Sequence, residues 1–449
     1  MDKSKYLTNV RDQYENYPFP QRNPRDEKRR LFTSEMDMLP KINHYCFNGK
    51  QTFDQGFRVL VAGGGTGDAV IYLAHQLKDS NAKVVYLDMS ESSMEIAKAR
   101  AAARKLDNIQ WIHGSILELP NMDLEPFDYI NCVGVLHHMA DPNKGLSSLA
   151  SVLAPDGAMG IMVYGHYGRI DIYATQDMMR LVTVDEPDLD QRVEYGKGLL
   201  KSIPPSNLLM RGRERERVLH QFFTDESDLV DCFLHEQDQA YTVPKLYDFI
   251  ESADLKLVEF TNYDQEGVCR IEYDPDMYVD NNPKLSEKLA KLSTKDRQSV
   301  AEVINGCIGL HSFYLSKKTD TIAKFDDPEN VPSFLTVGAV SQCHRLQKLA
   351  DGKQAKFQLR NGNHVWMDLG SIAKELIGLI DGKRTLGEIT DMLLLASDLE
   401  KEMSREELLQ RLQPDLDILN MLNWVVLRHS SVNEFSPLET VATFTLAKN

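Results

Sequence analysis

One short segment constrains the fold of this chain more than any other: a glycine-rich turn between an apolar run and a helical pattern. It reads Val59-Leu-Val-Ala-Gly-Gly-Gly-Thr-Gly-Asp68, and we expect Arg58–Ala62 to be a strand and Asp68–Leu77 a helix. Glycine permits a sharp turn and lets a ligand approach the backbone without a Cβ in the way, while the first turn of the helix presents free N–H groups. The turn alone fits a ligand-binding site and a plain loop equally well; in a binding site, Gly63, Gly65 and Gly67 are the candidate contacts.

Strand-like and helix-like patterns alternate around this turn. The further predicted strands are Lys83–Leu87, Ile109–His113, Tyr129–Val133, Ala158–Val163, Leu255–Phe260 and His311–Ser316. Predicted helices follow Ser90 or Ser92 as N-cap, span Gly145–Leu153 up to a turn at Pro155-Asp156-Gly157, and follow Thr242. Such alternation predicts a Rossmann-like α/β sheet covered by helices. A mostly helical insertion (166–240) and an irregular one (262–307) interrupt it.

Asp88 ends the second predicted strand, 21 residues after Gly67. A carboxylate at this place can accept hydrogen bonds from both hydroxyls of a ribose, and Met89 can lie against an adenine face. The alternative is a solvated Asp ahead of a helix. A dinucleotide fingerprint, G-x-G-x-x-G, would require glycine where Asp68 stands, so NAD is the poorer interpretation.

The charge of the chain argues against one class of partner. With 67 acidic and 51 basic side chains, the formal net charge is −16, which repels nucleic acid unless a local basic patch overrides it. Residues 211–217 alternate arginine with glutamate, as a solvated helix face does. No apolar run approaches the roughly 18 residues of a membrane helix, and none of the six cysteines forms a C-x-x-C pair. We expect reduced thiols, no metal site, no membrane or nucleic-acid partner, and a cytoplasmic location.

Five pieces of the chain in order, VLVAGGGTG, VVYLD, IHGSILELP, FDYINCVGVLHHMADP and LAPDGAMGIMVYG, resemble class I S-adenosylmethionine-dependent methyltransferases. The resemblance covers residues 56–165 and extends less clearly to 318. It implies S-adenosylmethionine as cofactor, with the glycine loop around its methionine part, Asp88 on the ribose, and Ser115 and Ile116 along the adenine. We add Val133 to the predicted cofactor contacts. The resemblance also implies an antiparallel strand near the end of the sheet, for which His311–Ser316 is the candidate.

Two positions depart from that family, because most members carry an acid where this chain has Val61 and Ser115. Both departures keep open a cofactor-binding regulatory protein. The segment 11–22 resembles the YEExPYPRW segment ahead of some methyltransferase cores, which implies that it lies over the cofactor pocket. Tyr14 and Tyr17 would then offer broad rings with polar ends to a substrate; the alternative is an N-terminal arm that packs for stability.

Candidate groups for chemistry follow the fourth and fifth predicted strands. Leu136-His137-His138 resembles the LHH of small-molecule methyltransferases, and either histidine can deprotonate a substrate oxygen or nitrogen near neutral pH. The alternative is a helix-capping or packing role. We also predict substrate contacts from Tyr164, His166 and Arg169, of which Arg169 can bind an acidic group through two parallel hydrogen bonds.

The pattern changes after residue 333. We expect a hairpin at Phe357–Asp368, a helix from Ser371, helices after the capping boxes Thr385-x-x-Glu388 and Ser404-x-x-Glu407, and a closing β-wing from Trp424–Leu427 and Val441–Leu446. The stretch 381–388 resembles small winged-helix domains, some of which hold peptide leaders in the assembly of pyrroloquinoline quinone. This region can therefore recruit a peptide substrate or dimerise the chain.

We divide the chain into an N-terminal arm with cap helices (1–55), an S-adenosylmethionine-binding methyltransferase domain (56–318), a linker (319–333) and a winged-helix-like α+β domain (334–449). Because the sheet elements are complete by about Ser316, we expect the α/β part to fold without the last domain. The expected function is methyl transfer to an oxygen or nitrogen of a small molecule or peptide. A regulatory protein with a degenerate pocket and a peptide-modifying enzyme that recruits through its C-terminal domain are the alternatives, and a homodimer is possible.

Overall fold

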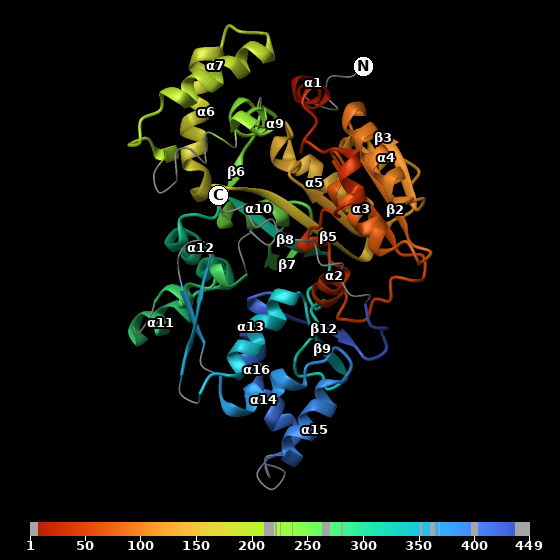
Figure 1. Cartoon of the computed structure of the whole chain (residues 1–449), viewed down its shortest axis with the longest axis vertical. Coiled ribbons are helices and arrows are strands. Elements are labelled where there is room, and N and C mark those ends of the chain that lie inside the picture. Colours follow the sequence, from red (N-terminus) through yellow and green to blue (C-terminus); the bar gives the residue numbers. More distant parts are fainter. Residues whose placement is uncertain are drawn as a thin grey trace.

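A computed structural model describes residues 8–210, 220, 222–224, 226–235, 237–262, 270–279, 282–350, 353–359, 364–367, 369–396 and 403–435. Three parts can be followed in Figure 1: an α/β domain, a helical arm built around α6 and α7, and a C-terminal lobe of helices α13 to α16. The basic stretch 211–217 and the predicted strand Val441–Leu446 lie outside the described residues.

The α/β domain is built on one sheet in the order β3-β2-β1-β4-β5-β8-β7, with β6 paired to β5. The strands β1 to β5 are parallel to one another, whereas β8 runs antiparallel to both β5 and β7. This is a Rossmann-like topology, and the antiparallel strand that the resemblance implied is confirmed. The strand bounds are β1 Arg58–Ala62, β2 Lys83–Asp88, β3 Ile109–His113, β4 Phe127–Val133, β5 Leu153–Gly165, β6 Ala240–Tyr241, β7 Lys256–Thr261 and β8 Leu310–Ser316.

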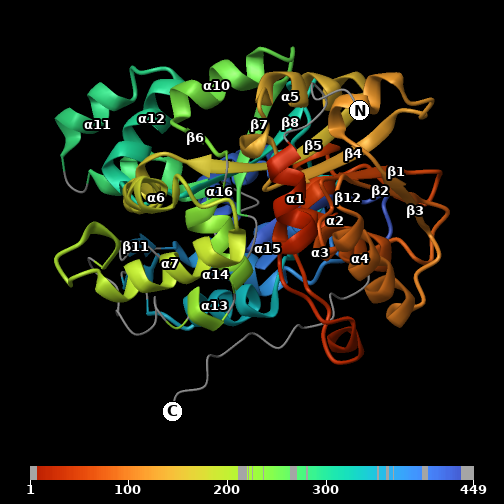
Figure 2. The same ribbon diagram turned by 90° about the horizontal axis from the view of Figure 1, so that it is seen from above.

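Apolar side chains cover both faces of this sheet, because successive residues of a strand point to opposite sides. Val59 and Val61 pack with one core and Leu60 and Ala62 with the other. Helices α2 (Leu39–Cys46), α3 (Asp68–Gln76) and α4 (Glu91–Arg104) cover the first face, and α5 (Pro142–Ser151) and α10 (Val243–Glu251) cover the second. Figure 2 shows these two layers on opposite sides of the strands.

Local signals position most of these elements correctly. Ser90, of the two predicted N-caps, accepts a hydrogen bond from the backbone N–H of Ser93 at the start of α4. The predicted turn at Pro155-Asp156-Gly157 is wrong: these residues belong to β5, which pairs with β4 through a register shift near Phe127. The three residues lie in the irregular part of β5, between the paired Leu153 and Ala158, and have no partner on β4.

The described residues of both insertions are mostly helical. The first contains η5 Tyr167–Arg169, α6 Ile170–Thr183, α7 Leu189–Ser202, η6 Leu208–Met210, α9 Glu226–Leu229 and the π-helical turn η7 Val230–Leu234. The second, predicted to be irregular, instead contains η8 Arg270–Tyr273, η9 Pro275–Tyr278, α11 Pro283–Leu289 and α12 Thr294–Asn305. Ser293 caps α12, a signal that the sequence interpretation overlooked. Ahead of the sheet lie α1 Thr8–Asn16, η1 Pro24–Lys28 and η2 Glu35–Asp37, and between its strands η3 Ile116–Asn121 and η4 Leu136–His138.

The C-terminal lobe contains β9 Asn330–Phe334, α13 Val337–Gln347, β10 Ala355–Gln358, β11 His364–Met367, α14 Ser371–Leu379, α15 Leu386–Ala396, α16 Arg405–Met421 and β12 Val425–His429. The predicted hairpin is confirmed as the antiparallel pair β10–β11. Both capping boxes are confirmed, since Thr385 and Glu388, and Ser404 and Glu407, exchange side chain–backbone bonds. The winged-helix likeness stays a prediction.

The lobe and the α/β domain share a core. Strand β9, which includes residues 330–333 of the predicted linker, pairs with β12, and Val426 of β12 packs in the same cluster as Tyr45 and Tyr314. The Tyr45 hydroxyl donates to Asn420 at 3.1 Å, and the Leu427 N–H donates to His44 Nδ1 at 3.1 Å. A chain that ends near residue 325 would expose these groups, so the structure weighs against the expected independence of the α/β part.

Among the described residues, no helix is long and apolar enough to span a bilayer.

Candidate active site

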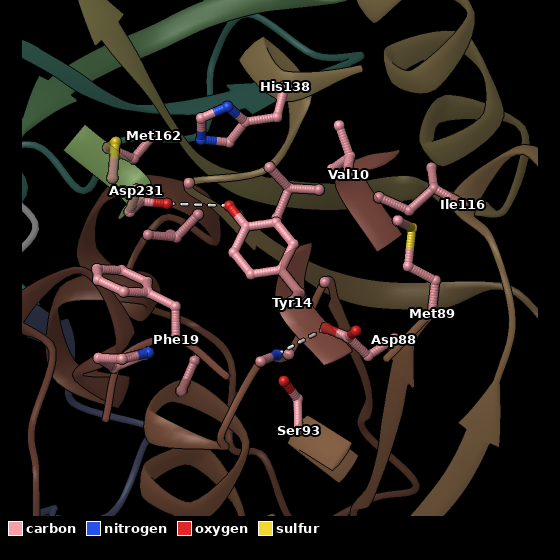
Figure 3. Close-up of a pocket in the computed structure, with 18 of the residues that line it drawn as sticks. Val10, Tyr14, Phe19, Asp88, Met89, Ser93, Ile116, His138, Met162 and Asp231 are labelled. Carbon is pink, nitrogen blue, oxygen red and sulfur yellow. Dashed lines mark hydrogen bonds between the residues drawn. The ribbon is translucent and has the colours of Figure 1, made fainter. Parts of the chain in front are cut away.

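A cavity of about 930 Å³ lies beyond the carboxyl ends of the parallel strands. Its wall combines the glycine turn after β1, the residues that follow β2, β3 and β4, the end of β5, and segments from α1 and η7. Ligands of open α/β sheets bind at this edge, where strand ends leave a crevice. Figure 3 shows Tyr14 inside the cavity, with Asp88, Met89 and Ile116 toward one end and Asp231, His138 and Met162 toward the other. We call these the cofactor end and the acceptor end.

The carboxylate of Asp88 is fixed by backbone donors at the cofactor end. Its Oδ2 accepts from the N–H of Gly65 at 2.8 Å, and its Oδ1 accepts from the N–H of Ser90 at 2.8 Å. Burial raises the pKa of Asp88, and these N–H groups oppose that shift because they stabilise the charged form. The carboxylate is therefore held in place on the cavity wall, where it can accept further bonds.

The glycine turn requires glycine for two separate reasons. Gly65 has φ +49°, and a Cβ there would lie 2.7 Å from the carbonyl oxygen of Phe19. Gly67, with φ +106°, is the N-cap of α3, where a Cβ would meet Ala97 at 2.8 Å. Of the three predicted glycines, Gly63 and Gly65 line the cavity, whereas Gly67 packs against α4 instead.

The other predicted cofactor contacts lie together on the same wall. Met89, Ser115, Ile116 and Val133 all line the cavity, as does Val61. The hydroxyl of Ser115 accepts from the N–H of Leu117, and its own N–H donates to Glu118 in a capping box. Ser115 thus shapes the start of η3.

The N-terminal segment closes over the cofactor end. Glu15 accepts from the N–H groups of Glu91 and Ser92 at 2.7 and 3.0 Å, and the Thr66 hydroxyl donates to the carbonyl of Pro20 at 2.7 Å. This is the placement that the resemblance of segment 11–22 implies. The two predicted tyrosines lie in different places. Tyr14 points into the cavity, whereas Tyr17 donates to Asp190 of α7 and does not line the cavity.

A buried ion cluster supports the glycine turn from below. Asp68 contacts Arg22 and Arg100, each at 2.7 Å, and Glu27 pairs with Arg100 at 2.7 Å and with Arg104. Burial raises the pKa of Asp68, but its bonds to the two arginines outweigh burial and hold that pKa below the ordinary value. Sequence reasoning missed Arg22, Glu27 and Arg100 because their partners are distant in the chain.

Asp231 organises the acceptor end. Its Oδ1 accepts from the Tyr14 hydroxyl at 3.0 Å, its Oδ2 accepts from the Tyr164 hydroxyl at 3.2 Å, and the Tyr14 oxygen also lies 3.3 Å from Nε2 of His235. Tyr14 and Asp231 are 217 positions apart in the chain. Asp231 and His235 come from the helical insertion, and no local motif marks them in the sequence.

The two candidate histidines occupy different environments. His138 lines the cavity, and its Nδ1 lies 2.9 Å from the carbonyl oxygen of Gln237, so Nδ1 carries the proton and Nε2 keeps a lone pair. His137 is fully buried between His138 and Tyr164, and neither of its ring nitrogens has a hydrogen-bond partner among the described residues. Burial lowers the pKa of both histidines. Only His138 is placed to accept a proton from a group in the cavity.

His138, Asp231 and His235 offer a donor set that resembles a metal site, since one ligand atom of each lies within 4.8 Å of the others. Two features of the arrangement oppose a metal. The two imidazole rings stack at 3.7 Å and 22°, so their in-plane lone pairs do not converge on one point. The N–H of Gln237 donates to Nδ1 of His235, which leaves the proton on Nε2, the nitrogen that faces Tyr14. The group fits a hydrogen-bonded cluster better than a metal centre.

Of the remaining predicted substrate contacts, Arg169 and Tyr164 line the cavity and His166 does not. The guanidinium of Arg169 lies 3.4 Å from the centroid of the Tyr164 ring, and its Nη2 is 3.8 Å from Asp238. Within the described part of the chain, Nε and Nη2 of Arg169 make no hydrogen bond. His166 is exposed and its ring stacks edge-on against Tyr167.

Comparison with known proteins agrees with this geometry. Residues 60–159, which span the glycine turn, Asp88 and both histidines, match the protein-family model described as "Methyltransferase domain". The chain contains a class I methyltransferase domain. An uncharacterized protein of a Synechococcus strain is 32% identical over 262 residues, which is 58% of this chain and 60% of that protein. The chain thus spans about three fifths of the length of that relative.

Two further relatives extend the comparison of the methyltransferase domain. The tRNA 5-carboxymethoxyuridine methyltransferase of Escherichia coli K12 is 27% identical over 186 residues, which is 40% of this chain and 70% of that protein. The solved structure of PKMT2 from Rickettsia typhi in complex with AdoHcy superposes with a TM-score of 0.58 at 17% identity. It covers 89% of this chain and 77% of its own, so the shared fold extends beyond the methyltransferase domain.

Proposed function

We propose that this chain is an S-adenosylmethionine-dependent methyltransferase that modifies an oxygen or nitrogen nucleophile of a small molecule or peptide. The methyltransferase-domain match and the fold support this proposal, as does the similar structure of PKMT2, which holds AdoHcy. The observation that carries it is one continuous cavity that contains a fixed carboxylate, Asp88, at one end and a neutral imidazole, His138, at the other.

The residues at the cofactor end fit the proposed cofactor. Asp88 lines the cavity with a carboxylate whose orientation is set by two backbone donors, which suits it to accept both ribose hydroxyls. Met89 and Ile116 give apolar surface on the adjoining wall for an adenine ring. Gly63 and Gly65 keep the floor of the cavity free of side chains.

The protein contributes orientation and proton transfer. When bound, S-adenosylmethionine supplies a methyl group on a sulfonium sulfur. A nucleophile attacks this methyl group in line with its bond to sulfur, and the sulfur is the leaving group. The chain holds the acceptor near that methyl group and excludes water, with the N-terminal segment closed over the cavity. Nε2 of His138 accepts the proton of an acceptor that arrives protonated.

Calorimetric titration of the full-length chain with S-adenosylmethionine and with S-adenosylhomocysteine tests the proposal. We expect both to bind, and Gly65→Val to abolish binding because the new side chain collides with the backbone of Phe19. The matched control is Gly198→Val on α7, where an added Cβ meets nothing within 4 Å. Absence of binding to the folded wild-type chain would refute the proposal, whereas binding without methyl transfer to any acceptor would favour the regulatory alternative.

A further inference from the structure

We propose that the methyl acceptor is a cationic amine, which Asp231 binds as an ammonium and His138 deprotonates. This inference rests on the proposed function and narrows its acceptor from oxygen or nitrogen nucleophiles to amines. It follows from the charge balance of the acceptor end, from the groups that surround Asp231, and from the tautomer of His138.

The acceptor end has a negative charge that no described cation neutralises. Asp231 accepts hydrogen bonds from the Tyr14 and Tyr164 hydroxyls, which are neutral, and it forms no ion pair within the part of the chain that the structure describes. The nearby cation, Arg169, lies 3.8 Å from a different carboxylate, the buried one of Asp238. Asp231 is partly buried, and a carboxylate in such a place is stabilised by an opposite charge beside it. A ligand that carries a positive charge and binds beside Asp231 supplies that opposite charge.

Neighbouring groups fit an ammonium better than an anion. Tyr14 donates to Asp231 and its ring lines the cavity, where an aromatic face attracts a cation. His138 and His235 lie within 4.8 Å of Asp231, and both are neutral because burial lowers their pKa values. An anionic acceptor directly beside Asp231 would be repelled by its carboxylate.

His138 completes the chemistry that an amine acceptor needs. An ammonium has no lone pair, so it must lose a proton before it attacks. Nδ1 of His138 donates to the carbonyl of Gln237. Nε2 has no hydrogen-bond partner among the described residues. The side chain lines the cavity and is only 5% exposed. The ammonium N–H bond breaks and its proton moves to Nε2. The freed lone pair forms the new N–CH₃ bond while the S–CH₃ bond breaks and its electron pair stays on sulfur. His138 later returns the proton to solvent, and the methylated amine leaves as an ammonium.

The competing explanation is that Asp231 balances the sulfonium of the methyl donor and not the acceptor. The two explanations differ in which pair of ligands Asp231 makes bind with unequal affinity. A carboxylate that serves the donor makes S-adenosylmethionine bind better than S-adenosylhomocysteine. A carboxylate that serves the acceptor makes an amine bind better than an alcohol of the same shape when S-adenosylhomocysteine is already in place.

The first experiment uses the full-length wild-type chain saturated with S-adenosylhomocysteine. It is titrated with benzylamine and benzyl alcohol, and with n-butylamine and n-butanol, and binding is followed by ligand-observed NMR. We expect each amine to bind at least about tenfold more tightly than its alcohol, the worth of one charge-assisted hydrogen bond. Equal affinity within each pair overturns the inference. Failure to bind S-adenosylhomocysteine at all would refute the proposed function itself, which keeps the two results distinct.

The second experiment removes the charge of Asp231. In Asp231→Asn, we expect the preference for amine over alcohol to fall by about 10- to 100-fold while the affinity for S-adenosylhomocysteine is unchanged. Asp231→Glu, which keeps the charge, should restore part of the preference. The control is Asp177→Asn on the exposed face of α6, which removes the same charge outside the cavity.

An Asp231→Asn variant that keeps its amine preference and loses only the advantage of S-adenosylmethionine over S-adenosylhomocysteine would assign the carboxylate to the donor and overturn the inference. Should that variant fail to fold, the wild-type probe pairs still decide the question, because they need no substitution.

Discussion

The two ends of the cavity are built in different ways. The cofactor end comes from short segments next to their own strands, and the residues that bond there, Gly65 and Asp88, are 23 positions apart. The acceptor end is assembled from α1, β5 and the helical insertion, so that Tyr14 and Asp231 meet across 217 positions. A parallel sheet presents its strand ends along one edge, which makes the first kind of site a direct result of the topology. The second kind exists only after the insertion has packed.

Electrostatics separates the two ends as well. Under the glycine turn, Asp68 is balanced by Arg22 and Arg100 in a buried cluster. At the acceptor end, Asp231 is balanced only by tyrosine hydroxyls among the described residues. The cofactor end is thus stabilised by the protein itself, whereas the acceptor end is completed by what it binds. Substitutions at the two ends should therefore affect different steps.

Among the substitutions that we predict, His138→Ala should have the largest effect, and the quantity that changes is turnover. Loss of a general base lowers turnover by roughly 10²- to 10⁴-fold, while cofactor affinity, measured by calorimetry, stays unchanged because the cofactor end is intact. His166→Ala is the matched control, since His166 is exposed and lies outside the cavity.

A pH profile of turnover sharpens this prediction. The neutral form of His138 is the active one, and burial lowers its pKa. Turnover should accordingly be flat around neutral pH and fall only below the ordinary histidine value of about 6.5, with the acid limb absent from His138→Ala. If His138→Ala turns over as fast as the wild type, His138 serves only in packing, and the two ends no longer differ in chemistry.

A smaller effect is expected at the cofactor end from Asp88→Ala. The variant loses a charged acceptor, which should cost about 1.5–3 kcal/mol of cofactor affinity. Calorimetry with S-adenosylhomocysteine measures this loss. Asp79→Ala, an exposed carboxylate on the loop before β2, serves as control. Unchanged affinity in a well-folded Asp88→Ala would show that the cofactor is held elsewhere.

The smallest effect is expected from Tyr14→Phe, which keeps the ring and removes one donor to Asp231. Because Tyr164 still donates to the other oxygen, we expect a loss of about 0.5–1.5 kcal/mol, seen in the KM of the acceptor. Cofactor affinity should hold. Tyr17→Phe in the same segment should change neither quantity, since its hydroxyl bonds to Asp190. Equal effects of both substitutions would mean that the segment acts as a whole and that its two tyrosines do not differ in role.

The sequence by itself predicted the sheet, the glycine turn, Asp88 and the caps at Ser404 and Thr385, because the signals for these lie within a few residues of one another. It failed at Pro155-Asp156-Gly157, which it assigned to a turn and which lies inside β5, in a bulge that the pairing with β4 defines. It also missed helices α11 and α12 in the second insertion, although Ser293 gave a usable capping signal.

Only the tertiary structure decided which of two nearby residues of similar chemistry lines the cavity. His137 and His138 are indistinguishable as neighbours in sequence, and one is buried against Tyr164 while the other lines the cavity. Tyr14 and Tyr17 differ in the same way. Asp231 and His235 carry no local signal at all, because their partners on α1 lie more than 200 positions away and contact them only through packing of the helical insertion. Strand ends and helix caps are set by backbone bonds between near neighbours, whereas the orientation of these side chains is set by contacts between segments that the sequence does not place side by side.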